Sequence, residues 1–204
     1  MDSRIIAVIG AFDENGVYGI DSHLPWENEN GRSSIKYDMG RFLYVTKETA
    51  PEGKQNVLIA GRSTAETFQM CPLPDRRMIV VSNTLDENEV NFGRNDDKKI
   101  VIARGLTEAM EKALVFDDCG HIFFIGGRTV WRRALVYSLC THAFITIVQC
   151  DAVAQSPYLG KVHKAPEMLQ DETYTGMKLE CSTSMVDTWG DKEVELEFRN
   201  YGRT

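Results

Sequence analysis

Paired cysteines, long apolar runs and an excess of basic charge are all missing from this sequence of 204 residues. Its five cysteines are odd in number, scattered and free of any C-x-x-C pair, which favours neither a zinc site nor a disulfide framework and suits a reducing compartment. No stretch approaches the roughly 20 apolar residues that cross a bilayer. Because no cleavage signal follows the N-terminal apolar run either, we expect a soluble, unprocessed, cytoplasmic protein. A formal charge of −7 argues against general nucleic-acid binding.

Hydrophobic residues make up 43% of the chain, which is enough to bury a substantial core. Since no linker, repeat or low-complexity segment interrupts the sequence, we expect 1–204 to form a single domain. The early and middle apolar runs are continuous, as in strands covered on both faces, whereas the last alternates as a one-sided strand would. Eight strands are predicted, at 4–12, 56–61, 77–83, 99–105, 121–127, 143–148, 177–182 and 193–198.

Helical patterns fall between these strands, at 33–49, 63–70, 106–114 and 128–136. Ser33 or Ser34 is expected to cap the first helix, and Ser63 with Glu66 has the spacing of a capping box. The alternation of strands and helices predicts an α/β fold. Its central sheet would be eight-stranded and mostly parallel, would end in a C-terminal antiparallel hairpin, and would be flanked by about four helices.

Three junctions after apolar strands favour ligand binding, because open α/β sheets bind ligands outside the carboxyl ends of their strands. The chain reads LIAGRST at 58–64 and FFIGGRTVW at 123–131, so glycine and arginine stand at the free N–H groups of a helix start. Either junction suits a phosphate, although a plain tight turn with a solvated arginine gives the same pattern. The third junction opens the long segment 13–26, whose Pro25 and Trp26 are typical of a functional lid.

Asp38 stands on the apolar face of the first expected helix, in line with Ile35, Phe42 and Thr46. A buried carboxylate is costly unless it is paired, so this position favours a ligand that presents hydrogen-bond donors. The alternative is an ordinary, partly exposed helix residue that forms an ion pair with Lys36 or Arg41.

The chain resembles the dihydrofolate reductase family in a set of motifs that occur in the family's order. They are AVIGAF with VYGIDSHLPW, DMGRF, NVLIAGRST, PLPDRRMIVVSN, IFFIGGRTVW and AFITIV, and they extend over about the first three quarters of the chain. The resemblance implies a dihydrofolate-reductase-like fold and NADPH-dependent reduction of 7,8-dihydrofolate to 5,6,7,8-tetrahydrofolate, with hydride added at C6 and a proton at N5. It also implies binding of folate and antifolates, a monomer, a role in one-carbon metabolism and thymidylate synthesis, and no metal.

For the substrate, the resemblance makes Asp38 the carboxylate that binds the pterin and supports protonation of N5, with Trp26 and Thr146 as the other catalytic residues. Arg76 would form a bidentate pair with the α-carboxylate of the glutamate. The full substrate-binding set that the resemblance implies is Ile9, Asp38, Met39, Phe42, Phe68, Leu73, Arg76, Ile125 and Thr146.

For the cofactor, the resemblance implies a nicotinamide site on the lid segment, phosphate sites at the two glycine-containing junctions, and an adenosine 2′-phosphate site near Ser82 and Arg104. The peptide bond between Gly126 and Gly127 would be cis. The implied cofactor-binding residues are Ala11, Tyr18, Gly19, Ile20, Gly61, Arg62, Ser63, Thr64, Ser82, Arg104, Gly126, Gly127, Arg128, Thr129, Val130 and Trp131.

The chain departs from the family pattern in three places. The loop 27–34 is longer than usual and carries Glu27 and Glu29 as rival carboxylates, which we expect to be solvated. Trp131 stands where the family usually has tyrosine, and Ala65 where it usually has tryptophan. Two alternatives therefore stay open: a reductase of the same fold that acts on another heterocycle, as in riboflavin synthesis, and a non-catalytic NADPH-binding homologue.

Overall fold

The computed structural model of the chain describes residues 4–28, 30–95, 99–170 and 176–203. Within these ranges, no helix is both long and apolar enough to cross a membrane. The strands are β1 (Ile6–Asp13), β2 (Val17–Ile20), β3 (Gln55–Gly61), β4 (Arg76–Val81), β5 (Val101–Ala103), β6 (Cys119–Gly126), β7 (His142–Val148), β8 (Val162–Lys164), β9 (Lys178–Trp189) and β10 (Lys192–Gly202). The helices are α1 (Lys36–Leu43), the π-helical turn η1 (Tyr44–Glu48), α2 (Arg62–Thr67), α3 (Glu87–Asn91), α4 (Leu106–Val115), α5 (Arg128–Val136), α6 (Ala152–Gln155) and α7 (Glu167–Gln170).

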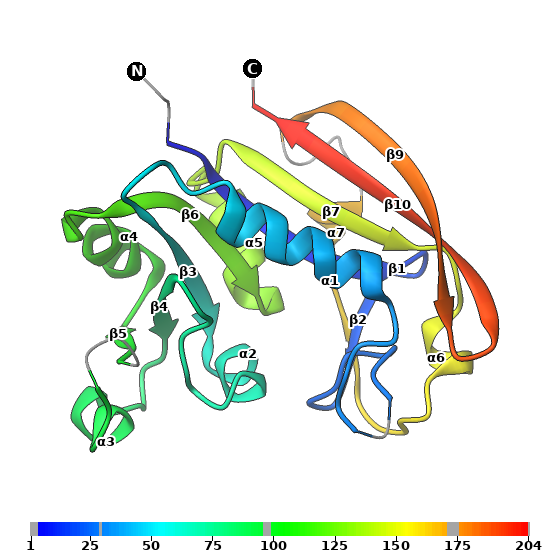
Figure 1. Cartoon of the computed structure of the whole chain (residues 1–204), viewed down its shortest axis with the longest axis horizontal. Coiled ribbons are helices and arrows are strands. Elements are labelled where there is room, and N and C mark those ends of the chain that lie inside the picture. Colours follow the sequence, from blue (N-terminus) through cyan, green and yellow to red (C-terminus); the bar gives the residue numbers. More distant parts are fainter. Residues whose placement is uncertain (1–3, 29, 96–98, 171–175, 204) are drawn as a thin grey trace. The chain divides into compact units, whose positions relative to one another are not determined.

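Eight strands form one sheet in the order β5-β4-β3-β6-β1-β7-β10-β9 (Figure 1). The pairs β1–β6, β3–β6, β3–β4 and β4–β5 are parallel, and β10 is antiparallel to both β7 and β9. The expected α/β fold, with its eight-stranded sheet and terminal hairpin, is confirmed. The four expected helices are present, and α3, α6 and α7 are added by segments of four or five residues that are too short to show helical periodicity.

The chain divides into two compact units. The first unit comprises the residues up to Val8 and Tyr44–Cys140, and the second comprises Ile9–Leu43 and the residues from Thr141 on. Strand β1 contributes to both units, because the division falls within it.

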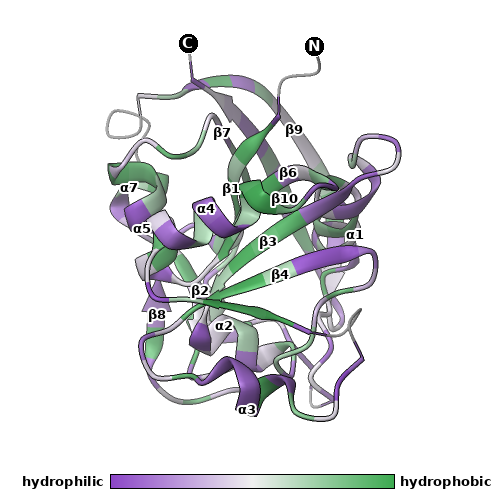
Figure 2. Cartoon of the chain, turned by 90° about the vertical axis from the view of Figure 1, so that its left-hand side faces the viewer, coloured by the Kyte–Doolittle hydropathy of each residue, from purple (hydrophilic) through white to green (hydrophobic). Residues whose placement is uncertain are grey.

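The first unit is built on strands that are apolar along most of their length. All eight residues of β6 are buried, as expected of a strand covered on both faces, and helices α4 and α5 both pack against it. Figure 2 shows that β3 and β4 are hydrophilic where they begin and hydrophobic along the rest of their length. The polar starts correspond to Gln55 and Asn56 in β3 and to Arg76 and Arg77 in β4.

The second unit is organised around the long β9–β10 hairpin and strand β7 (Figure 1). A buried apolar cluster joins this hairpin to the first forty residues of the chain, and it includes Val17, Trp26, Ile35, Val148, Trp189 and Leu196. The segment 13–26, which the sequence marks as a lid loop, contains a short strand, β2, that pairs with β8. Four residues interrupted by Gly19 gave too short a pattern to distinguish this strand from a loop.

Candidate active site

Helix α1 carries Asp38 as its one buried residue, with 9% of the residue exposed. The helix is anchored by another carboxylate, that of Asp187 on β9, whose Oδ2 accepts the backbone N–H of Tyr37 at 2.7 Å. The expectation that Ser33 or Ser34 caps this helix is not confirmed, because Oγ of Ser33 accepts the N–H of Ile35 at 3.2 Å, ahead of the first turn. The start of α1 is therefore held by an acceptor about 150 residues away in sequence.

Burial raises the pKa of the Asp38 carboxyl above its usual range, because the interior disfavours the charged form. A hydrogen bond from the Thr146 side chain and the positive charge of Arg41 act in the opposite direction, and the negative charge of Asp187 adds to the increase. A carboxyl group held in this way can exchange protons at a higher pH than an exposed aspartate can, which is a property of general acids and bases. The alternative of a partly exposed Asp38 is wrong.

Arg41 lies one turn beyond Asp38 and reaches strands β7 and β10. Its Nη1 donates to Oγ1 of Thr146 at 3.0 Å, and its Nη2 donates to the carbonyl of Arg199 at 3.1 Å and to Oδ1 of Asn200 at 2.6 Å. The guanidinium carbon stands 4.9 Å from the centroid of the Phe198 ring. Burial lowers the pKa of Arg41 to about 10, so the side chain stays cationic at neutral pH.

Trp26 is fully buried, in the apolar cluster of the second unit. Its indole meets that of Trp189 edge to face, with ring centroids 6.4 Å apart and an interplanar angle of 83°. The indole N–H has no hydrogen-bond partner within the described part of the chain. A buried donor of this kind normally bonds to a water or a ligand, so Trp26 is fitted to hold one.

Backbone contacts join the two ends of the enlarged loop after Trp26. The backbone N–H of Asn28 donates to the carbonyl of Arg32 at 2.8 Å, and Glu27 pairs with Ser33 in an isolated bridge. The carboxylate of Glu27 contacts Nδ1 of His23 at 3.0 Å, so it is a half-buried, paired residue rather than the solvated one that we expected. Glu29, the other rival carboxylate, lies outside the described residues.

In the first unit, the two glycine-containing junctions both lead directly into helices. Helix α2 follows Gly61 and helix α5 follows Gly127, and neither glycine supplies a side-chain cap, so the first N–H groups of both helices are left for other acceptors. The predicted capping box of Ser63 and Glu66 is wrong, because Glu66 turns back to Nε of Arg62 at 2.7 Å.

These junctions are also close together within the first unit. A methyl group on Gly61 would stand 3.6 Å from the backbone nitrogen of Gly127, and one on Gly126 would stand 3.1 Å from Oγ1 of Thr64. The peptide bond between Gly126 and Gly127 is cis, as the resemblance implied. Two helix starts with exposed Arg62 and Arg128 thus converge on backbone that carries no side chains, which fits the phosphates of a dinucleotide.

Ser82 and Arg104 lie together in the first unit, as expected. Nη1 of Arg104 donates to the carbonyl oxygens of Ser82 and Leu85, each at 2.8 Å. The hydroxyl of the buried Ser82 accepts the N–H groups of Thr84 and Leu85 at 3.3 and 3.2 Å. A cation fixed on an ordered loop is suited to binding an additional phosphate.

Arg76 is buried at the start of β4 although it carries a charge. Its Nη1 donates to Oγ1 of Thr46 at 2.8 Å, and its Nε donates to the carbonyl of Pro74 at 3.1 Å. These two bonds use two of the five guanidinium N–H donors, and burial lowers the pKa of the Arg76 side chain. A held guanidinium with spare donors suits an anionic ligand.

The remaining predicted residues fall into the same two sets. Ile9, Met39, Phe42, Ala11, Tyr18, Gly19 and Ile20 belong to the second unit with Asp38 and Thr146, and Phe68, Leu73, Ile125, Thr129, Val130 and Trp131 belong to the first unit. Trp131 is buried and donates its indole N–H to the carbonyl of Phe124 at 3.1 Å. Ala65 is fully buried.

Sequence reasoning missed Asp187 and treated Arg41 only as an ion-pair partner. Both residues act through contacts between α1 and strands that are far away in sequence. The position of neither residue in the sequence indicates such a contact.

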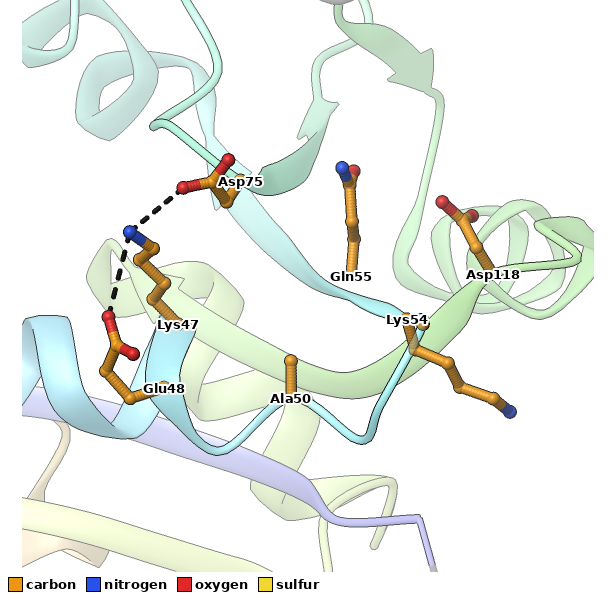
Figure 3. A pocket seen from close by; sticks show the side chains of 8 residues that line it. Lys47, Glu48, Ala50, Lys54, Gln55, Asp75 and Asp118 are labelled. Carbon is orange, nitrogen blue, oxygen red and sulfur yellow. Dashed lines mark ion pairs between the residues drawn. The ribbon is translucent and has the colours of Figure 1, made fainter.

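The first unit also has a polar pocket near η1, which none of the predicted site residues lines (Figure 3). Nζ of Lys47 stands 2.9 Å from a carboxylate oxygen of Asp75 and 3.7 Å from one of Glu48. Asp118 is paired with Arg77 at 2.8 Å. The side chains of Lys47, Glu48, Asp75 and Asp118 are thus already engaged in ion pairs.

Comparison with known proteins gives one consistent result. A family model described as "Dihydrofolate reductase" matches residues 5–166. The dihydrofolate reductase of Drosophila melanogaster is 31% identical over 141 residues, which are 68% of this chain and 70% of that protein. The enzyme of Saccharomyces cerevisiae is 27% identical over 210 residues, covering 97% and 92% of the two chains. The solved structure of Enterococcus faecalis dihydrofolate reductase, complexed with NADP(H) and RAB-propyl, covers 98% of this chain and 96% of its own at 19% identity, with a TM-score of 0.67. The chain belongs to the dihydrofolate reductase family.

Proposed function

We propose that this protein is an NADPH-dependent oxidoreductase that reduces 7,8-dihydrofolate to 5,6,7,8-tetrahydrofolate, and so supports one-carbon metabolism and thymidylate synthesis. The observation that carries the proposal is the buried carboxyl of Asp38, hydrogen-bonded to Thr146 in a chain of this family. A single buried carboxyl on a helix face is the group that a pterin requires, because the pterin edge presents an amino group and a ring N–H to the two oxygens of a carboxylate.

The residues of the second unit supply binding and proton chemistry. Asp38 accepts the two pterin donors and fixes the ring, while Thr146 holds the carboxylate in orientation. The indole N–H of Trp26 is the donor available for a water or the pterin. In the reaction, C6 of dihydrofolate gains a hydride and N5 gains a proton, and Asp38 favours the protonated ring by its negative charge. Ile9, Met39 and Phe42 contribute apolar contacts to the substrate.

The first unit supplies the means to bind the cofactor. NADPH, when bound, supplies the hydride from C4 of its nicotinamide. Arg62, Ser63 and Thr64 at the start of α2, and Arg128 and Thr129 at the start of α5, bind the phosphates. Arg104 and Ser82 bind the 2′-phosphate, which favours NADPH over NADH. The absence of side chains at Gly61, Gly126 and Gly127 supports binding of NADPH by these residues, because the backbone can approach a ligand closely there.

Arg76 distinguishes between the substrates of two kinds of reductase that share this fold. Its spare guanidinium donors suit the α-carboxylate of the glutamate part of folate, which a ribosylated pyrimidine lacks. Phe68, Leu73 and Ile125 contribute apolar contacts to the rest of the molecule. The proposal therefore favours a folate over the heterocycle of riboflavin synthesis.

We further propose that the chain acts as one domain, as a monomer in the cytoplasm, and that antifolates compete with dihydrofolate for the same residues. The decisive test is the loss of NADPH absorbance on addition of dihydrofolate, measured for the wild type and for Asp38→Asn. Rapid oxidation by the wild type and its collapse in the variant are expected. NADPH binding without oxidation would instead favour the non-catalytic alternative.

A further inference from the structure

We propose that Arg41 is a positioning residue for the active-site carboxylate: its guanidinium, fixed on strand β10, directs the Thr146 hydroxyl proton toward Asp38. The inference rests on the proposed function for its catalytic meaning. The geometry that carries it lies entirely within the second unit.

The first step is the pattern of donors around the Thr146 hydroxyl. A threonine hydroxyl has one O–H donor and two acceptor lone pairs, whereas a guanidinium can only donate. Because Nη1 of Arg41 donates to Oγ1 of Thr146 at 3.0 Å, one lone pair is used and the O–H stays free to donate. An ionised carboxylate can only accept, so the hydrogen bond between Thr146 and Asp38 then runs from the hydroxyl to the carboxylate.

The second step is the rigidity of Arg41. Its Nη2 donates both to the carbonyl of Arg199 and to Oδ1 of Asn200, at 3.1 and 2.6 Å, and its guanidinium lies over the ring of Phe198. Phe198 is the direct cross-strand partner of Thr146. Since side chains alternate along a strand, Thr146, Phe198 and Asn200 share the face of the sheet on which Arg41 lies.

The third step is the balance of charge around Asp38. Arg41 on the same helix favours the ionised carboxylate, and Asp187 on the neighbouring β9 opposes it. Thr146 on β7 adds a neutral donor. Two charged residues that act in opposite directions on one carboxyl give a matched pair of variants.

The test follows the titration of Asp38 directly, by NMR of the full chain labelled with carbon-13 at the aspartate carboxyl groups. The Asp38 signal is identified as the one lost in Asp38→Asn. We expect Arg41→Leu to move its titration to higher pH and Asp187→Asn to move it to lower pH. Arg41→Lys, which keeps the charge but loses the forked donors, should fall between the wild type and Arg41→Leu.

A second readout follows the pH profile of the single-turnover oxidation of NADPH by dihydrofolate. Arg41→Leu is expected to reduce the rate at pH 7 by about tenfold or more and to shift the profile in the same direction as the NMR titration. If Arg41→Leu does not fold, Arg41→Gln keeps an N–H donor without the charge and takes its place.

The outcomes separate the two proposals. An Asp38 titration that is the same in the wild type, Arg41→Leu and Arg41→Lys would overturn the positioning role, whatever the activity. A wild type that shows the expected shifts between variants but does not oxidise NADPH with dihydrofolate would overturn the proposed function and leave the role of Arg41 toward Asp38 supported.

Discussion

The carboxylate of Asp13 accepts the backbone N–H of Ala152 at 2.9 Å and so joins two segments 139 residues apart in the second unit. Its other oxygen accepts the N–H groups of Asn15 and Val17 at 2.9 and 2.7 Å. Only 1% of the residue is exposed, so one buried side chain satisfies three backbone donors at the end of β1.

Asp13→Ala should therefore destabilise the protein. Removal of a buried acceptor leaves its partners unsatisfied, at a cost of about 1–3 kcal/mol for each such group, partly relieved by water entry. Urea unfolding followed by circular dichroism measures the change in the free energy of unfolding. Asp151→Ala is the matched control, because Asp151 is exposed and, among the residues that the structure describes, accepts the N–H of Ala154 alone. Equal losses in both variants would contradict the importance of burial.

Asp38→Asn should abolish most activity and stabilise the ligand-free protein. A carboxyl whose pKa is raised on folding binds its proton more strongly in the folded state than in the unfolded state. The folded state therefore loses stability as the pH rises from about 3.8, the ordinary value, through the raised value, and the loss is complete above it. At pH 7 we expect the free energy of unfolding of the variant to exceed that of the wild type by about 0.5–2 kcal/mol, a typical increase when a functional site is replaced by a more stable one.

The pH dependence is the control for this prediction. The gain should shrink toward zero below the ordinary pKa, where both proteins carry a neutral group at position 38. In parallel, kcat should fall on the order of 100-fold or more at pH 7, with partial recovery at low pH, where dihydrofolate arrives already protonated. A stability gain that is independent of pH would show that burial of the charge is not its cause.

Gly126→Ala should impair both stability and binding of NADPH. The residue has φ of 136°, which side chains rarely adopt, and the added methyl group would stand 3.1 Å from Oγ1 of Thr64. We expect a loss of about 1–3 kcal/mol in the free energy of unfolding and a higher Kd for NADPH by fluorescence titration.

Gly40→Ala provides the contrast within a helix. Nothing lies within 4 Å of the position that its methyl group would occupy in α1. The substitution should raise stability by about 0.5–1 kcal/mol, because alanine favours a helix over glycine. A loss in Gly40→Ala as large as that in Gly126→Ala would mean that the local conformation of Gly126 is not the reason for its sensitivity.

Arg104→Gln should reduce the preference for NADPH over NADH. The guanidinium is fixed to the loop of Ser82 by two hydrogen bonds of 2.8 Å, so its removal takes away a preorganised cation. We expect KM for NADPH to rise about tenfold, the effect of roughly 1.4 kcal/mol, with KM for NADH little changed. Arg132→Gln, an exposed arginine on α5, controls for the loss of one positive charge. An equal rise in KM for both cofactors would assign Arg104 a purely structural role.

The sequence by itself determined the succession of the longer strands and helices along the chain and the resemblance to the family, because continuous apolar runs, helical spacing and ordered motifs are local patterns. The order of the strands within the sheet came only from the structure. It also placed Asp38 on the buried side of α1, because Asp38 and Phe42 are one helical turn apart. Thr46 falls in the π-helical turn η1, which the spacing did not predict. Short elements such as β2 and α6 lay below the length at which a period can be recognised.

Only the tertiary structure decided how the carboxyl of Asp38 is held. The contacts of Arg41 with Thr146 and Asn200, and of Asp187 with Tyr37, join residues more than 100 positions apart. The helix caps are a second example. Ser33 and Ser63 are residue types that commonly cap helices, but the carboxylate of Asp187 holds the start of α1, and Glu66 pairs with Arg62. Hydrogen-bond partners are selected by their proximity in the folded structure, and the spacing of residues along the chain does not specify that proximity.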